Sequence, residues 1–132
     1  MTDPVSQRLL LDDPLIAVVG ATDAPGKYGG IIYRDMKAKG YRVVPIITAR
    51  PTVDGDPTVA SLTDLDEVPD IVNVVVPPVR TMAVLDDIAA MDDVAVWIQP
   101  GAADRAVRER VDELGLPALI DACIMVQSRS RL

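Results

Sequence analysis

The chain has 132 residues, of which 49% are apolar, so it is long enough for one domain with its own hydrophobic core. Its formal net charge of -7 argues against a nucleic-acid partner, because binding to a phosphate backbone depends on an excess of Lys and Arg. The single cysteine, Cys123, cannot form an internal disulfide, which fits a reducing compartment. We therefore expect a cytoplasmic protein that binds neither nucleic acid nor membrane.

Residues 1–14 predict a short N-terminal helix and no targeting signal. Asp3 followed by Pro4 is typical of an N-cap and a first helical position. The apolar side of this helix would consist of Val5, Leu9 and Leu10. Acidic residues surround this short apolar run, unlike a cationic signal peptide or a membrane span. We expect the helix to cover one face of a sheet.

The stretch LIAVVGATDAPGKYGG, residues 15–30, predicts a strand, a loop and the start of a helix. The continuous apolar run from Leu15 to Val19 is typical of a parallel strand buried on both faces. Gly20 ends the strand, and a glycine pair opens an amphipathic helix over residues 28–39. Backbone N–H groups at a helix start lack helical partners and carry the positive end of the dipole. This junction therefore predicts a site for an anionic, nucleotide-type ligand.

Strands and helices alternate along the rest of the chain. The expected strands are 42–47, 71–76, 94–98 and 117–120, and the expected helices are 79–90 and 103–114. Pro45 restricts its strand to an edge or a strand end. Residues 48–69 are predicted to form a surface connection with one helical turn after Ser61. Residues 123–126 would complete the core, and residues 127–132 would form a polar tail.

This alternation predicts a single domain of the α/β class with a Rossmann-like, doubly wound fold. Its five-stranded, mostly parallel sheet would carry helices on both faces. Ligands of such sheets bind beyond the carboxyl ends of the strands, where the strand order reverses. The fold would bring four segments to that edge: the loop after Gly20, the turn 48–50, the pair 77–78 and the turn 99–101.

Cationic residues gather in the segment 27–50, although the chain as a whole is acidic. The segment holds six Lys or Arg residues and one acid. Lys27 lies in the loop and Arg50 follows the next strand, so these two are candidates for phosphate contacts. The lysines within the helix are assigned to its solvated face. Tyr28, beside the loop, is a further candidate for contact with a ligand.

The expected dinucleotide fingerprint is absent. An NAD site of this fold has G-x-G-x-x-G after the first strand and an acid at the end of the second, which holds the ribose hydroxyls. Here Gly20 is followed by Ala21 and Thr22, and the second strand leads to Arg50, which would favour a phosphorylated ribose. An NAD(P)-binding redox enzyme or sensor is kept as an alternative.

Five motifs together resemble the small stand-alone CoA-binding proteins, whose fold also forms the CoA-binding domain of the succinyl-CoA synthetase alpha subunit. In chain order they are IAVVGATDAPGKYGG, YRVVPI, VPP, WIQPG and DACIMV, within residues 9–126. The resemblance implies non-covalent binding of coenzyme A or an acyl-CoA. A partner-regulated interaction module of an acyl-CoA enzyme is a further alternative, and a homo-oligomer is compatible with the sequence.

The same resemblance implies which residues line the site. Around the phosphates it places Gly20, Ala21, Thr22, Asp23, Ala24 and Pro25, with Lys27 nearby. At the adenosine end and its 3'-phosphate it places Thr48 and Arg50. One wall would consist of Pro77, Pro78 and Arg80. The path of the pantetheine arm would follow Ile98, Gln99, Pro100 and Gly101.

No catalytic constellation is present in the sequence. The chain contains no His, so the phosphohistidine chemistry of succinyl-CoA synthetases is not available, and neither is a Ser-His or Cys-His pair. Adjacent acids such as Asp86 and Asp87 are interpreted as solvated charge. Cys123 and Trp97 lie in apolar contexts and are interpreted as core residues. We expect no catalytic residue and no metal site.

Overall fold

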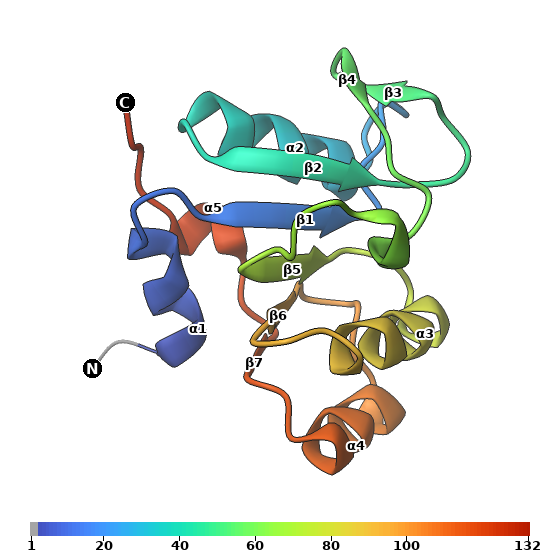
Figure 1. Ribbon diagram of the computed structural model, residues 1–132. Coiled ribbons are helices and arrows are strands. Elements are labelled where there is room, and N and C mark those ends of the chain that lie inside the picture. The colour runs from blue at the N-terminus through green and yellow to red at the C-terminus, as the bar shows by residue number, and fades with distance from the viewer. Residues whose placement is uncertain (1–2) are drawn as a thin grey trace.

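Five parallel strands form the centre of the molecule, as the continuous apolar runs predict (Figure 1). They are β1 (Leu15–Val19), β2 (Arg42–Ile46), β5 (Ile71–Val74), β6 (Ala95–Ile98) and β7 (Ala118–Ile120). The computed structural model describes residues 3–132. The strand order is β2-β1-β5-β6-β7 and all four pairings are parallel, so the order reverses between β1 and β5. The predicted Rossmann-like, doubly wound α/β fold is confirmed.

Helices cover both faces of the sheet (Figure 1). One face is covered by α1 (Pro4–Gln7), the 3-10 turn η1 (Arg8–Leu10), α2 (Tyr28–Ala38) and α5 (Ile124–Gln127). The other is covered by the 3-10 turn η2 (Leu62–Asp64), α3 (Pro78–Ala89) and α4 (Arg105–Leu114). Within β1, Ile16 and Val18 face the first layer, whereas Ala17 and Val19 face the second. This alternation explains why the strand needs apolar residues at every position.

Several helices begin or end at the capping residues predicted from the sequence. The Asp3 carboxylate accepts a hydrogen bond from the Val5 N–H at 2.7 Å, and Pro4 opens α1. Ser61 caps η2 through the Thr63 N–H. At the C-terminal end of α4, Gly115 adopts the left-handed conformation, φ 65°. The strands predicted over 71–76 and 94–98 are shorter in the structure by one or two residues, a usual margin for element boundaries.

Leu10, expected on the apolar side of the first helix, is exposed instead, and so is Tyr28, the candidate for ligand contact. Leu10 is 76% exposed, because the chain tightens into the 3-10 turn η1, whose shorter period turns Leu9 inward and Leu10 outward. Tyr28 is 63% exposed at the start of α2, while Ile32, Tyr33 and Met36 fill the core. The first turn of α2 therefore faces the edge of the sheet where ligands bind, and only its later turns pack against the strands.

Strand β2 lies at the edge of the sheet, where Pro45 is tolerated. The Pro45 carbonyl faces outward and accepts a hydrogen bond from the Val59 N–H at 2.9 Å. Val59 in turn accepts from the Ile47 N–H at 3.0 Å, which forms an isolated parallel bridge beside β2. The missing N–H of Pro45 therefore removes no bond to β1. The bridge also holds the segment that follows Val59 close to the carboxyl end of β2.

The connection 48–69 contains a small hairpin that the sequence analysis missed. Its strands are β3 (Thr52–Val53) and β4 (Asp56–Pro57), and they pair antiparallel. The turn residues Asp54 (φ 49°) and Gly55 (φ 80°) both have positive φ, as the two-residue turns of type I' require. An Asp-Gly pair is the strongest short-range hairpin signal, so this element was predictable.

Helix α2 anchors the hairpin. The Tyr33 hydroxyl donates to the Asp56 carboxylate at 2.5 Å, and the Lys37 ammonium forms ion pairs with Asp54 at 3.1 Å and Asp56 at 2.9 Å. Burial, followed by the hydrogen bond to Asp56, raises the pKa of Tyr33. The hydrogen bonds from Tyr33 and Lys37 lower the pKa of Asp56. Val53 is fully buried in the same core layer, so the hairpin is a packed part of the domain.

None of the helices within residues 3–132 is long and apolar enough to span a bilayer.

Candidate ligand-binding site

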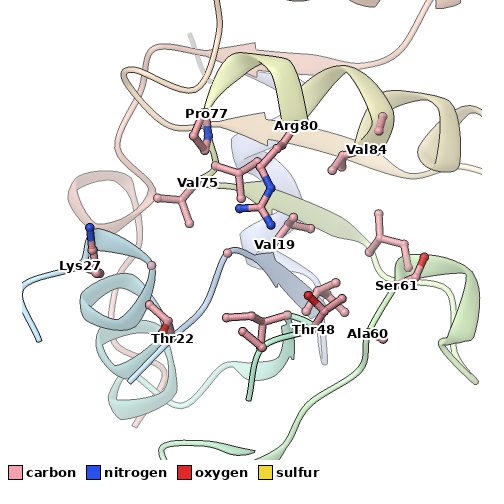
Figure 2. A pocket seen from close by; sticks show the side chains of 18 of the residues that line it. Val19, Thr22, Lys27, Thr48, Ala60, Ser61, Val75, Pro77, Arg80 and Val84 are labelled. Atoms are coloured by element: carbon pink, nitrogen blue, oxygen red, sulfur yellow. The ribbon is translucent and has the colours of Figure 1, made fainter. Parts of the chain in front are cut away.

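A pocket of about 750 Å³ opens at the carboxyl ends of β1, β2 and β5 (Figure 2). It lies where the strand order reverses, which is the usual ligand position in doubly wound sheets. The loop after β1 and the first turn of α2 form one end, and α3 with the segment 60–62 forms the other. Figure 2 shows this arrangement, with Lys27 at one end and Ser61 at the other.

Glycines allow α2 to approach the loop after β1 very closely. A Cβ atom on Gly29 would lie 1.9 Å from the Gly20 carbonyl oxygen, and one on Gly30 would lie 2.1 Å from the Thr22 carbonyl oxygen. No larger residue fits either position without moving the backbone. The glycine pair therefore places the first turn of α2 against the loop, at the pocket.

The N-terminus of α2 is open toward the pocket. Lys27 occupies the N-cap position and makes no side-chain hydrogen bond to the helix, and Tyr28 and Gly29 line the pocket. The first N–H groups of any helix lack intrahelical partners and carry the positive end of the dipole. This end of the pocket is therefore suited to an anion.

Two cationic side chains that line the pocket have no acidic partner among the described residues. Lys27 and Arg80 line it, and neither forms an ion pair with any described residue. In Figure 2 the Arg80 side chain extends from α3 into the space between Val75 and Val19. Most other cations are paired, namely Arg8, Arg34, Lys37, Lys39, Arg42, Arg105, Arg108 and Arg110. Arg50, Arg129 and Arg131 also lack an acidic partner among the described residues, but none of them lines the pocket. Two unpaired cations in one pocket favour a negatively charged ligand.

The rest of the lining is mainly aliphatic. Its apolar lining consists of Val19, Ile46, Ile47, Ala60, Leu62, Val75, Val76, Val79, Ala83 and Val84. Polar groups are few there: the hydroxyls of Thr48 and Ser61 and the carboxylate of Asp87. An apolar lining with a few polar groups is typical of a site for a small organic ligand.

Many of the site residues predicted from the sequence are brought together. Those that line the pocket are Gly20, Thr22, Ala24, Lys27, Tyr28, Thr48, Pro77 and Arg80. A second hollow of about 280 Å³ adjoins the first and shares Val75, Val76 and Pro77 with it. The predicted residues that line this second hollow are Pro78, Pro100 and Gly101.

Six predicted site residues lie outside both hollows: Ala21, Asp23, Pro25, Arg50, Ile98 and Gln99. Ala21 and Ile98 are fully buried in the two core layers, so their side chains serve packing. The Asp23 carboxylate turns toward the hairpin and accepts a hydrogen bond from the Asp54 N–H at 2.9 Å. The Gln99 amide is buried beneath the turn and donates to the Asn73 side chain at 2.6 Å.

Two parts of the lining were not predicted from the sequence. One is the segment 60–62, which the bridge between Ile46 and Val59 draws toward β2. The other is the later part of α3, where Ala83, Val84 and Asp87 follow Arg80 at helical spacing on one face. That spacing was a usable signal, because residues three, four and seven positions apart share a helix face.

Neither hollow is lined by His or Cys. The chain has no His, and within residues 3–132 no three His, Cys, Asp or Glu side chains are grouped so that they could hold a metal ion. Cys123 is half-buried and lies outside both hollows. What the pocket offers is two cations, an open helix N-terminus and an apolar slot. Together with the fold, these features define a class: doubly wound α/β proteins with a pocket that carries cationic side chains at the point where the strand order reverses.

Comparison with known proteins gives the family within this class. The model of the CoA binding domain family matches residues 15–129, and the chain belongs to that family. The match includes all five strands of the sheet and every segment that lines the pocket.

Similar proteins occur in bacteria and archaea. The Bacillus subtilis protein YneT is 31% identical over 123 residues, which cover 91% of this chain and 89% of YneT. The solved structure of cell-free ID.343 from Thermus thermophilus is 33% identical and covers 96% of each chain, with a TM-score of 0.80. The dinucleotide-forming acetyl-coenzyme A synthetase 1 of Ca. Korarchaeum cryptofilum is 20% identical, with a TM-score of 0.71. It covers 94% of this chain but only 30% of the synthetase, and it shows a shared fold.

Proposed function

We propose that the protein binds coenzyme A or an acyl-CoA non-covalently in the pocket between β1 and β5, and that it has no catalytic residues of its own. Membership of the CoA binding domain family supports the ligand class. The observation that carries the proposal is that Lys27, at the open N-terminus of α2, and Arg80, on α3, line one pocket and have no acidic partner among the described residues. A diphosphate is the part of CoA that these groups would bind.

The shape of the pocket gives the rest of CoA a place. The adenosine would occupy the aliphatic slot between α3 and the segment 60–62, beside Thr48. The pantetheine arm would leave through the adjoining hollow past Pro100 and Gly101, which shares a wall with the main pocket. Arg50 follows Thr48 by two residues, and we propose that its side chain meets the 3'-phosphate at the rim.

The lining gives less support to a nicotinamide dinucleotide. Thr48 and Ala49 line the pocket after β2, where a dinucleotide site needs an acid for the ribose hydroxyls. The proposed place of action is the cytoplasm, in keeping with a single, half-buried cysteine.

A calorimetric titration of the purified protein with CoA tests the proposal, with NAD and NADP as parallel ligands at the same salt concentration. We expect saturable binding of CoA with one site per chain and no saturable binding of NAD or NADP. Equilibrium dialysis followed by adenine absorbance serves as a second readout that does not depend on a binding enthalpy. Absence of CoA binding in both assays would overturn the proposed function, and saturable NAD(P) binding would replace it with the redox alternative.

A parallel titration with acetyl-CoA addresses the thiol end. If the pantetheine arm leaves through the open hollow, its terminal sulfur makes no contact that contributes to affinity. CoA and acetyl-CoA should then bind with dissociation constants within about twofold of each other. A much stronger preference for either form would assign a specific contact to that end of the ligand.

A further inference from the structure

Helix α3 presents three kinds of side chain to the pocket in a fixed order. Arg80, Val84 and Asp87 occupy positions i, i+4 and i+7 of the helix, and all three line the pocket, as does Ala83 between them. These positions lie on one face and span about 10 Å along the axis. Along the pocket, the wall formed by α3 therefore changes from cationic to aliphatic to anionic.

The carboxylate of Asp87 differs from its neighbour in what it contacts. Asp86 points toward α4, where its carboxylate accepts from the Arg110 guanidinium at 2.9 Å. Asp87 is half-buried and lines the pocket, and among residues 3–132 its carboxylate has no hydrogen-bond or ion-pair partner. The interpretation of this acid pair as solvated charge therefore applies to Asp86, whereas Asp87 is free to act on a ligand.

The surroundings of Asp87 exclude an anion and favour a neutral group with a hydrogen-bond donor. The nearby lining is apolar or hydroxylic, with Val84 on the same helix and Ser61 and Leu62 opposite. Arg80, the cation on this wall, lies two helical turns away, beyond the reach of a direct contact with Asp87. A phosphate would therefore bind at the Arg80 end, and an N–H donor at the Asp87 end.

We infer that Asp87 reads the base of the bound nucleotide: its carboxylate accepts a hydrogen bond from the 6-amino group of adenine. The inference rests on the proposed function, because it assigns an orientation to the nucleotide in that same pocket. A carboxylate only accepts hydrogen bonds at neutral pH, so it attracts the amino group of adenine and repels the carbonyl oxygen that hypoxanthine and guanine carry there. Asp87 thereby selects adenine nucleotides and fixes the direction in which they enter.

The test compares CoA with its deaminated counterpart, in which hypoxanthine replaces adenine and the rest of the molecule is unchanged. For the wild-type protein we expect deamino-CoA to bind about tenfold more weakly than CoA, since a half-exposed charged acceptor loses its donor and faces a carbonyl. In the variant Asp87→Asn the side-chain amide can donate as well as accept, so the ratio should fall to about twofold or less. The matched control is Asp86→Asn, which should keep the wild-type ratio.

The outcomes separate this inference from the proposed function. If CoA binds and deamino-CoA binds equally well to the wild-type protein, the assignment of Asp87 is overturned while the proposed function stands. The assignment is also overturned if Asp87→Asn keeps the wild-type ratio, or if Asp86→Asn lowers it as much. If neither ligand binds to the wild-type protein, the proposed function fails and the assignment fails with it.

Discussion

The two ends of the pocket are built in different ways. The end that we assign to phosphate comes mainly from one contiguous stretch, residues 20–29, in which a loop leads directly into α2, and Arg80 adds a second cation from the start of α3. The other end is assembled from β2, the segment 60–62 and the later part of α3, which are far apart in the sequence. The first depends on close backbone contact through glycines, whereas the second depends on side chains that the fold brings together. Each end should therefore respond to a different kind of substitution.

The largest expected effect comes from breaking the backbone contact at the first end. In Gly29→Ala the new Cβ would lie 1.9 Å from the Gly20 carbonyl oxygen, so the helix and loop must separate. We expect a loss of about 3 kcal/mol in the free energy of unfolding, measured by urea denaturation, and loss of CoA binding. The control is Gly26→Ala, where the Cβ meets nothing within 4 Å and only the φ of 73° is strained. A loss in Gly26→Ala as large as in Gly29→Ala would contradict the close-contact argument.

Removing the unpaired cations tests the electrostatics of the same end without disturbing its backbone. Lys27→Gln and Arg80→Gln should each weaken CoA binding about tenfold, because each loses a charge-assisted hydrogen bond to the diphosphate. Both variants should also show a shallower dependence of affinity on salt. The matched control is Arg129→Gln, the same change of charge at an exposed residue outside the pocket. Equal weakening in all three variants would point to net charge instead of direct contact.

A smaller effect at the second end would sharpen the comparison. Arg50→Ala should weaken CoA about fivefold but leave 3'-dephospho-CoA nearly unchanged, because only CoA carries the 3'-phosphate. Arg50 is half-buried and lies outside the lining, so the proposed contact would be made at the rim of the pocket, where charge interactions are weaker. Calorimetric titration of both ligands measures the difference. Equal losses of affinity for the two ligands would show that Arg50 does not contact the 3'-phosphate.

The smallest effect concerns the hairpin, which supports the loop through Asp23. Tyr33→Phe removes the hydrogen bond to Asp56 and should lower the free energy of unfolding by about 1 kcal/mol, with little change in CoA affinity. Because the Tyr33 hydrogen bond lowers the pKa of Asp56 in the folded state, its stabilisation is present above the ordinary carboxyl pKa and is lost as the pH falls through the lowered value. The difference in stability between wild type and variant should therefore shrink in acid. A constant difference across pH would assign the loss to packing alone.

The fold was predictable because its signals are local. Continuous apolar runs specified β1 and β6, a proline marked the edge strand, and glycine marked the end of α4. The loop end of the pocket was predictable for the same reason, since strand, loop and helix start are contiguous. The segment 60–62 could not be placed, because the bridge that positions it joins Ile46 to Val59 across a hairpin. Asp87 was missed because its sequence context resembles solvated charge, and only its position on α3 separates it from Asp86.

The bridge between Val59 and β2 also bears on how copies of the chain avoid one another in concentrated solution. An open edge strand offers unpaired donors and acceptors to which another chain can add a strand, which is a common start of aggregation. Here Val59 occupies the outward carbonyl of Pro45 and the outward N–H of Ile47, and Pro45 itself offers no donor. Arg42, at the start of the same strand, is held by the Glu67 carboxylate at 2.9 Å and adds charge beside the edge. The contact that shapes one end of the pocket thereby also protects this edge of the sheet from intermolecular strand addition.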